Sequence, residues 1–174
     1  ALDQLAYYGR GPIGNYPDRK TGQMLGIYRT TAAQEFVNFP KPQDMANHQD
    51  TRWAQLTDNN GNGAVFINPD GMSISLLPYT ANELAMANHP HELPASSGNT
   101  LHLDAAITGL GGNSCGQGAP LPPDRVKADV HHIVLVIRPV NHDVQQSYQP
   151  EKVQGNSWIP RADYVRMTSL TSSK

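Results

Sequence analysis

The sequence predicts a mainly β domain, an antiparallel β-sandwich with one short helix. Short apolar runs alternate with polar residues, as they do in strands that bury one face. Turn residues separate these runs, and the 174-residue chain contains 15 glycines and 14 prolines. Only one segment carries a clear helix start signal. This combination favours a sandwich or barrel over a parallel doubly wound sheet, in which strands alternate with helices.

The strands follow from the apolar runs and the turn residues between them. The run "LDQLAYYG" predicts a first strand that ends at Gly9. Two Asn-Gly steps and one Asp-Gly step then divide "TRWAQLTDNNGNGAVFINPDGMSISLLP". Because these dipeptides tolerate the positive φ of tight hairpin turns, we predict a meander of strands at 52–58, 63–68 and 71–77.

The predicted helix begins at Thr80. Thr80 and Glu83 have the spacing of a capping box, and the apolar pattern stops before Pro90. The segment "NTLHLDAAITGL" alternates apolar and polar residues and predicts a further strand. The segment "HHIVLVIRPV" is the most apolar and is rich in β-branched residues, so we predict a strand buried on both faces.

These elements suggest a β-sandwich domain over residues 1–140. Residues 141–174 are polar and weakly periodic, and we expect an irregular extension that packs on the domain or is partly frayed. The net charge of −2 argues against nucleic acid or membrane partners, and no apolar run approaches the length of a membrane span. The single cysteine, Cys115, excludes an internal disulfide and leaves the compartment open.

The stretch "GRGPIGNYPDRK" resembles a phosphate-binding loop only superficially. Its glycines lack the required spacing, its prolines interrupt the run, and no helical pattern follows. We therefore predict a rigid turn in which Asp18 and Arg19 bond to neighbouring groups and hold the loop against the sheet.

Histidine and cysteine supply the other candidate sites. His89 and His91 straddle a proline and could converge on a metal ion, but no third ligand has a recognisable spacing. Adjacent His131 and His132 would point to opposite faces of a strand, so we predict no metal site. Cys115 lies among glycines that could form an oxyanion hole, although a small residue in a tight loop is the simpler interpretation. The carboxylates show no local glycosidase signature.

Four segments in order resemble the C-terminal domain of family-two glycoside hydrolases of the β-galactosidase type. They are "YGRGPIGNYPDRK", "KPQDMANHQDTRW", "ANELAMANHPHEL" and "LHLDAAITGLGGNSCGQG". Each is weak alone, but the ordered set spans about residues 5–139 and is specific.

The resemblance implies a galactose mutarotase-like supersandwich, possibly a partial one. In that family the catalytic glutamates and the main magnesium site belong to a separate barrel domain. The resemblance therefore implies no catalytic residue and no cofactor in this chain, although the parent family usually uses Mg²⁺. The implied role is structural and active-site-completing in an enzyme that hydrolyses terminal non-reducing β-D-galactosides. The implied partners are the remaining domains of the enzyme and carbohydrate, in either the periplasm or the cytoplasm of a bacterium.

The resemblance also implies substrate-binding residues. In the family, the loop after the Gly-x-Gly turn leans into the active-site mouth, which points to Asn113, Ser114 and Cys115. Cys115 stands where some members carry a sugar-stacking tryptophan, so an aromatic platform is absent there. Trp53 and His89 complete the predicted set.

Two other functions remain open. A stand-alone carbohydrate-binding module would use the concave face of the sheet, with Trp53, Tyr79, His89, His102 and Asn113 as lining residues. An active aldose epimerase would need a histidine base and a carboxylate that face each other across a pocket, and the sequence assigns neither.

Four positions depart from the family pattern, namely Gly14, Asp44, Ala46 and Gln117. Ala46 replaces a glycine, which often marks positive φ, and suggests that the loop has relaxed there. A further prediction concerns Arg52 and Trp53, which must face opposite sides of a strand. We expect one of them to be buried with a carboxylate partner such as Asp50 or Asp104.

Overall fold

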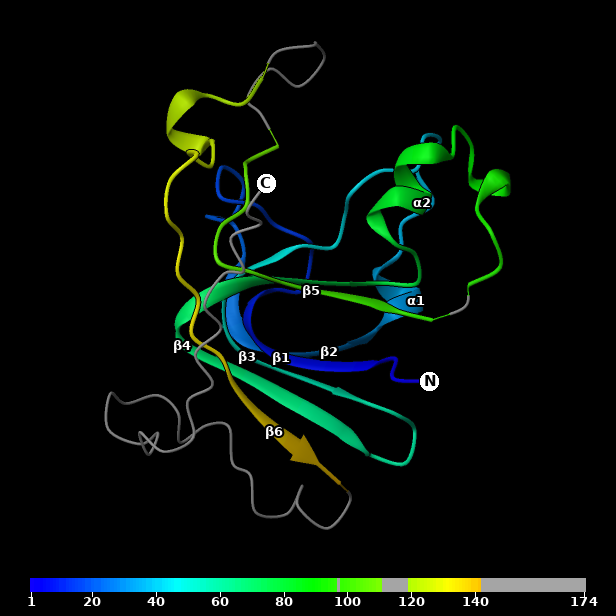
Figure 1. Ribbon diagram of the computed structural model, residues 1–174, viewed down its shortest axis with the longest axis vertical. Helices are drawn as coiled ribbons and strands as arrows, with labels where there is room; N and C mark the ends of the chain where they lie inside the picture. The colour runs from blue at the N-terminus through cyan, green and yellow to red at the C-terminus, as the bar shows by residue number, and fades with distance from the viewer. Residues whose placement is uncertain (97, 111–118, 142–174) are drawn as a thin grey trace, which may run out of the picture.

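The computed structural model describes residues 1–96, 98–110 and 119–141. Its strands form one antiparallel sheet in the order β2-β1-β3-β4-β5, with β6 also paired to β4 (Figure 1). The strands are β1 (Gln4–Gly11), β2 (Met24–Thr31), β3 (His48–Thr57), β4 (Gly63–Leu77), β5 (Thr100–Asp104) and β6 (Val136–Val140). The helices are α1 (Ala32–Glu35) and α2 (Ala81–Met86), with 3₁₀ turns η1 (Pro90–Glu92) and η2 (Pro122–Asp124). The mainly antiparallel β prediction is confirmed, and the fold is consistent with a sandwich.

Strand β4 organises the sheet because it pairs with different neighbours along its length. Its first half, from Gly63 to Ile67, pairs with β6, and its second half, from Ser73 to Leu77, pairs with β5. Strand β3 pairs with both halves, with register shifts between His48 and Trp53.

The predicted hairpin at Asp70-Gly71 is wrong. Gly71 has a φ of +98°, as expected, but it lies within β4, opposite the register shifts of β3. The positive φ accommodates an irregularity in a continuous strand rather than a reversal of the chain. The Asn-Gly hairpin between β3 and β4 is confirmed, with Gly61 at a φ of 79° and a hydrogen bond from Asp58 N to Asn62 O.

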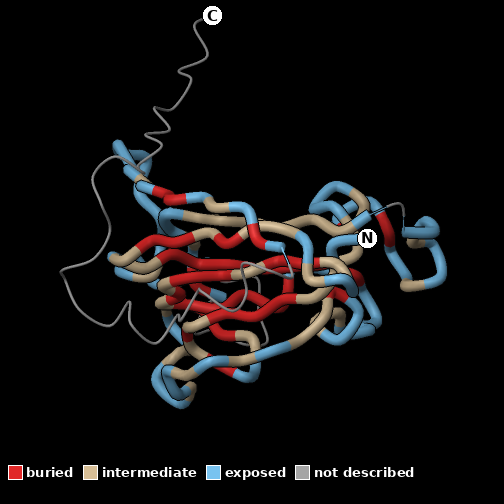
Figure 2. Tube along the Cα trace, turned by 90° about the horizontal axis from the view of Figure 1, so that it is seen from below, coloured by how far each residue is buried: buried red, intermediate tan, exposed pale blue. Residues whose placement is uncertain are grey.

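The sheet buries apolar side chains on both faces, and Figure 2 shows the buried residues along its central strands. One cluster consists of Leu5, Tyr7, Ala32, Ala54, Leu56, Met72, Ile74, Leu76 and Leu135. The opposite face carries Ala6, Trp53, Val65, Ile67, Val136 and Val140. This division follows from the period of two, because neighbouring residues such as Leu5 and Ala6 point to opposite faces.

The other differences from the predictions concern the end of β1, two elements that were not predicted, and the burial of β6. Strand β1 continues to Gly11 rather than Gly9, and neither β2 nor α1 was predicted. Strand β6 is not buried on both faces, since Ile137 is 43% exposed. Val136 and Val140 pack in the core cluster with Trp53, whereas Ile137 points to the opposite face of the strand and is exposed. Most of the predicted extension, 142–174, lies outside the described residues.

The helix prediction is confirmed. The Thr80 side chain accepts from Glu83 N, and the Glu83 carboxylate accepts from Thr80 N, which completes the capping box of α2. No helix in the described part of the chain has the length and apolar character needed to cross a membrane.

The prediction for Arg52 and Trp53 is half right. Trp53 is the buried one of the pair, with 2% of its surface exposed. Arg52 donates to the Pro69 carbonyl across the irregular part of β4, and not to a carboxylate. Asp50 is instead bound by two other cations, Arg10 and Lys20.

Candidate functional site

The predicted site residues fall into three places. Asn113, Ser114 and Cys115 lie outside the described residues. Trp53 packs in the core cluster with Ala6 and Val65, so its ring is not on the surface, and its indole N–H finds no acceptor among the described groups. His89 is exposed and follows α2.

The two residues that lead into the Asn113 loop, Gly109 and Leu110, are nevertheless fixed by hydrogen bonds. Leu110 N donates to the Asp18 carboxylate over 3.1 Å, and Gly109 N donates to the Asp124 carbonyl over 2.8 Å. A Cβ at Gly109 would lie 2.6 Å from Asp18 Cγ, so only glycine permits this approach. Asp18 therefore holds the base of the loop, which differs from the local role in the turn that the sequence predicted for it.

A buried polar layer joins the first two sequence motifs. Asn15, which is 0% exposed, donates through Nδ2 to the Arg10 and Ile13 carbonyls and accepts from Gln49 N. Asn47 Nδ2 donates to the Asn15 carbonyl over 2.7 Å. The two asparagines clip the first loop onto the start of β3 and satisfy buried backbone groups.

His48 extends this layer. Its imidazole is fully buried, with Nε2 3.0 Å from Glu35 Oε2 and Nδ1 2.9 Å from the Tyr7 hydroxyl. Burial, and then the Glu35 carboxylate, raises the pKa of Tyr7 well above its ordinary range. Tyr7 therefore remains protonated. Nδ1 of His48 also lies 3.1 Å from the Arg10 carbonyl, which can only accept, so the ring joins the Tyr7 hydroxyl, the Arg10 backbone and the Glu35 carboxylate. The imidazole is fully buried and the Glu35 side chain is only 10% exposed, so we interpret the arrangement as structural rather than catalytic.

Asp50 sits beside the same loop, between two cations. Arg10 Nε lies 2.5 Å from Asp50 Oδ2, and Lys20 Nζ lies 2.8 Å from Asp50 Oδ1. Burial acts to raise the pKa of Asp50, but the Lys20 ammonium and the Arg10 guanidinium together hold it below its ordinary value. The ionised carboxylate thus ties Lys20, at the end of the loop, to strands β1 and β3.

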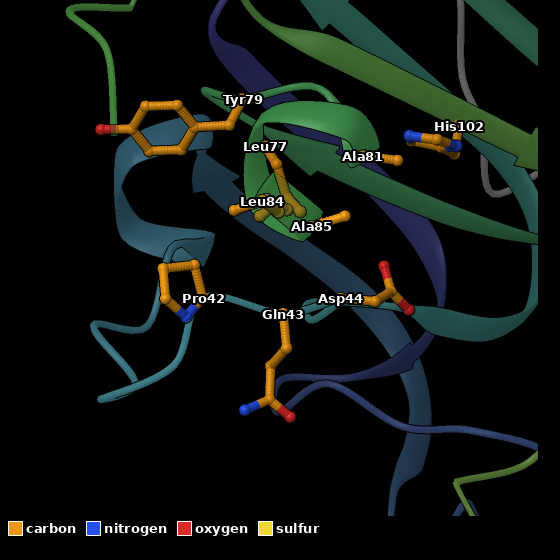
Figure 3. A pocket seen from close by; sticks show the side chains of 9 residues that line it. All are labelled: Pro42, Gln43, Asp44, Leu77, Tyr79, Ala81, Leu84, Ala85 and His102. Atoms are coloured by element: carbon orange, nitrogen blue, oxygen red, sulfur yellow. The ribbon is translucent and has the colours of Figure 1, made fainter. Parts of the chain in front are cut away.

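A pocket of about 310 Å³ opens between α2 and the segment before β3 (Figure 3). It is lined by Pro42, Gln43, Asp44, Leu77, Tyr79, Ala81, Leu84, Ala85 and His102. Figure 3 shows Tyr79 on one side and Asp44 with His102 on the other. The structure thus brings together Tyr79 and His102, both expected as lining residues, and adds Asp44, which the sequence offered only as one unassigned carboxylate.

Local interactions shape the pocket walls. Leu84, on the inner face of α2, packs with Met45, Ala46 and Leu77. Lys41 Nζ bonds carbonyls at the end of α2, including Ala85 O over 3.4 Å, as cations commonly do at helix C-termini. These contacts hold the 41–46 segment and α2 together.

Burial, together with the charge of Asp44 in the pocket wall, raises the pKa of two groups beside the pocket, Tyr16 and Asp104. The Tyr16 hydroxyl donates to Asp44 Oδ2 over 3.2 Å, and burial, followed by the Asp44 charge, raises the pKa of Tyr16. Burial also raises the pKa of nearby Asp104, while His102 acts to lower it and Asp44 adds to the rise. The pocket lining therefore offers the Asp44 carboxylate, the His102 imidazole and the Gln43 amide, which could bond hydroxyl groups. His102 and Asp44 thus line the same pocket, a combination that the sequence alone could not assign.

Comparisons with known proteins identify related chains. Residues 1–137 match the family described as the β-galactosidase small chain. A β-galactosidase of Priestia megaterium is 34% identical over 122 residues, which cover 70% of this chain and 12% of that protein. One of an Arthrobacter species is 34% identical over 145 residues, covering 79% of this chain and 14% of that protein. β-Galactosidase BgaC of Bifidobacterium adolescentis is 39% identical over 112 residues, which cover 63% of this chain and 11% of that protein. The chain thus matches only a small part of each relative.

Proposed function

Since this chain belongs to the β-galactosidase small-chain family, we propose that it is the C-terminal, non-catalytic domain of a larger β-galactosidase. The observation that carries this proposal is the family match over residues 1–137, combined with relatives of which this chain covers 11–14%. The whole enzyme would hydrolyse terminal non-reducing β-D-galactosides, with its catalytic glutamates in a separate barrel domain. The fold would be part of a galactose mutarotase-like supersandwich.

The internal structure supports a structural role for the first two motifs. At most 1% of the surface of Asn15, Asn47 and His48 is exposed. Asn47 bonds to the Asn15 carbonyl, and His48 bonds to the Glu35 carboxylate. Such residues position a loop and cannot reach a sugar. The family's magnesium belongs to the barrel domain. In the described part of this chain, the one group of three potential ligands is His89, His91 and Glu92, whose nitrogen donors suit Mg²⁺ poorly.

The active-site-completing part of the role rests on the loop after Leu110. We propose that Asn113, Ser114 and Cys115 approach the substrate in the assembled enzyme, and that Asp18 sets the direction of their loop through its bond to Leu110 N. His89 and Trp53 are weaker candidates, because Trp53 would first have to leave the core.

A domain exchange tests the function. The matching segment of the Arthrobacter β-galactosidase is replaced by this chain, and hydrolysis of a chromogenic galactoside is compared with a variant that lacks the segment. We expect the exchange to restore activity that the deletion abolishes, while the 174-residue chain alone shows none. Turnover by the chain alone would contradict the assignment as a non-catalytic domain.

A matched pair of glycine variants tests the loop in that chimera. Gly109→Ala forces the Asp18 carboxylate to move, whereas Gly22→Ala places its methyl group in open space. We expect Gly109→Ala to lower kcat/KM about tenfold, the equivalent of one displaced hydrogen bond to a charged group, and Gly22→Ala to leave it unchanged. If both variants have the same kcat/KM, the proposed role of Asp18 in directing the loop is wrong.

The pocket favours carbohydrate binding as a second candidate function. It has the size of a small-molecule site and combines the Tyr79 ring with Gln43, Asp44 and His102. Titration calorimetry of the chain with galactose and lactose would show millimolar or tighter binding that Asp44→Ala weakens. If neither galactose nor lactose produces heat of binding, this second function is wrong.

A further inference from the structure

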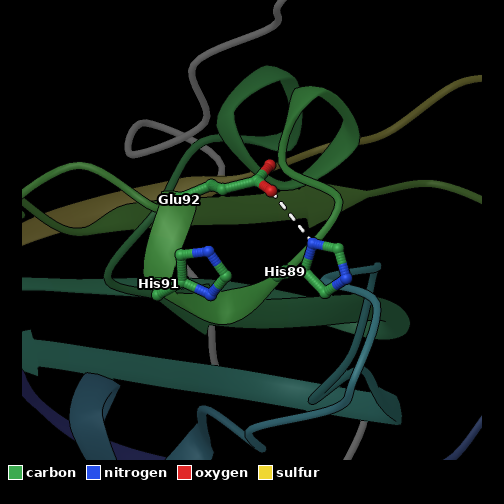
Figure 4. Close-up of side chains that lie close together, drawn as sticks. All are labelled: His89, His91 and Glu92. Atoms are coloured by element: carbon green, nitrogen blue, oxygen red, sulfur yellow. Dashed lines mark hydrogen bonds and ion pairs between the residues drawn. The ribbon is translucent and has the colours of Figure 1, made fainter.

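Three side chains directly after α2 form a cluster to which the proposed function assigns no metal. His89, His91 and Glu92 project from η1 and the residue before it, and all three are exposed (Figure 4). We refer to them as the His89–Glu92 corner. One potential ligand atom from each lies within 4.8 Å of those from the other two. The sequence suggested that the two histidines could converge, and the structure supplies the third ligand that was missing.

The local backbone explains why these side chains meet. Pro90 begins η1, where its fixed φ suits the first position of a helical turn. Glu92 N donates to the His89 carbonyl over 3.0 Å, which closes the turn. His89 and Glu92 are therefore neighbours at spacing three, and Nδ1 of His89 lies 2.9 Å from Oε1 of Glu92. The rings of His89 and His91 are stacked, with centroids 5.4 Å apart.

Glu92 is held in a state that suits a cation. Asn88 N donates to its Oε2 over 2.8 Å. The carboxylate is thus oriented through one oxygen, while the other faces His89, an arrangement typical of metal ligands that are supported by a neighbouring hydrogen bond.

We propose that His89, His91 and Glu92 bind a zinc ion, with water in the fourth position. Two imidazoles and a carboxylate form a donor set that tetrahedral Zn²⁺ commonly accepts. Ligand atoms in such a site lie about 3.4 Å apart, as follows from Zn–N and Zn–O distances of about 2.0–2.2 Å. The His89–Glu92 contact already approaches this spacing, and an ion would replace the proton that the two groups share. His91 needs only a small side-chain rotation, which its exposure permits.

Zinc binding at this site would stabilise the end of α2, the helix that forms part of the pocket wall. The His89–Glu92 corner follows α2 directly, and α2 contributes Ala81, Leu84 and Ala85 to the pocket. A bound ion would fix the residues that follow the helix, and Lys41 already bonds the carbonyls at the end of the helix. The proposal does not depend on the assignment to a β-galactosidase.

Titration calorimetry of the 174-residue chain with zinc chloride tests the proposal. We expect one site with a dissociation constant below about 100 µM, and no comparable heat with magnesium chloride. His91→Ala and Glu92→Gln should each weaken zinc binding at least about tenfold, in line with the loss of a ligand from a three-ligand site.

The matched control removes two exposed histidines elsewhere. His131→Ala combined with His132→Ala changes the histidine count but not the corner, so the dissociation constant should stay the same. The melting temperatures of the metal-free variants confirm that each one folds. The proposal is overturned if zinc binds no tighter than 1 mM, or if the control variant loses binding while His91→Ala and Glu92→Gln retain it.

Discussion

Two groups of polar side chains in this molecule contrast in their surroundings. Asn15, Asn47 and His48, below the first loop, are at most 1% exposed. Asn15 and His48 each bond to several partners, whereas the Asn47 side chain makes one bond, to the Asn15 carbonyl, and its Oδ1 has no partner among the described groups. His89 and Glu92, after α2, have side chains that are 62% and 39% exposed. A buried polar group must keep its partners, because losing one leaves it unsatisfied, whereas an exposed group can exchange its partner for water or a ligand. The contrast separates residues that stabilise the fold from residues available for binding.

The largest expected effect is at His48. Replacing His48 with alanine leaves the Glu35 carboxylate and the Tyr7 hydroxyl without their shared partner and removes a fully buried ring. We expect the free energy of unfolding to fall by about 3–5 kcal/mol, as for other broken buried pairs. Urea denaturation of both proteins measures this change.

A control from the exposed group sharpens the comparison. His91→Ala should change the free energy of unfolding by less than about 0.5 kcal/mol in metal-free buffer, because surface substitutions seldom do more. Similar losses for His48→Ala and His91→Ala would show that burial does not distinguish the two groups.

The second effect concerns Asp50, which lies between the two extremes of burial. Its folded-state pKa is lowered, so its contribution is present above the ordinary aspartate pKa and is lost as pH falls through the folded value. Because the three side chains are a quarter to a third exposed, we expect only about 1 kcal/mol.

Asp50→Asn provides the measurement. Asparagine tolerates the φ of 55° found here, so the substitution mainly removes charge. The variant should unfold more easily than the original protein at pH 7, and the gap should close as the pH falls below the folded-state pKa of Asp50. A gap that persists at low pH would point to backbone strain rather than to the ion pairs.

The sequence was informative where structure is set by local chemistry. The capping box of α2 and the Asn-Gly hairpin were predicted because a few adjacent residues determine them. Strand β2 was missed because none of its residues is buried and its apolar residues Met24, Leu25 and Ile27 are exposed, so they mark no buried face. The Asp70-Gly71 prediction failed because pairing with β3, β5 and β6 along β4 keeps the strand continuous through a residue of positive φ.

The sites were harder to predict for the same reason. The pocket joins Asp44, Tyr79 and His102 from three separate segments, and no spacing in the sequence reveals their proximity. The Asp18–Leu110 contact spans 92 positions. By contrast, His89, His91 and Glu92 are close in sequence. Glu92 was overlooked because the turn that brings it back to His89 was not predicted.

The third effect is at the cap of the exposed helix. Thr80→Ala removes the side-chain oxygen that accepts from Glu83 N, and we expect a loss of about 0.5–1 kcal/mol in urea denaturation. Thr80→Ser keeps the oxygen and should lose little. If both variants lose equally, the methyl group of Thr80 matters more than the cap.

The smallest effect is expected at Ala46, where the two regions meet. Ala46 has a φ of 60°, so the loop has not relaxed to suit alanine, as the sequence had suggested. A left-handed conformation costs an L-residue about 1–2 kcal/mol, which roughly balances the about 0.5–1 kcal/mol of backbone entropy and about 0.8 kcal/mol of methyl burial that glycine would forfeit. Ala46→Gly should therefore change the free energy of unfolding by less than about 0.5 kcal/mol, whereas Ala6→Gly, equally buried but within β1, should lower it by about 1.5 kcal/mol. A loss at both positions would mean that the buried methyl group of Ala46 contributes more than its backbone strain costs.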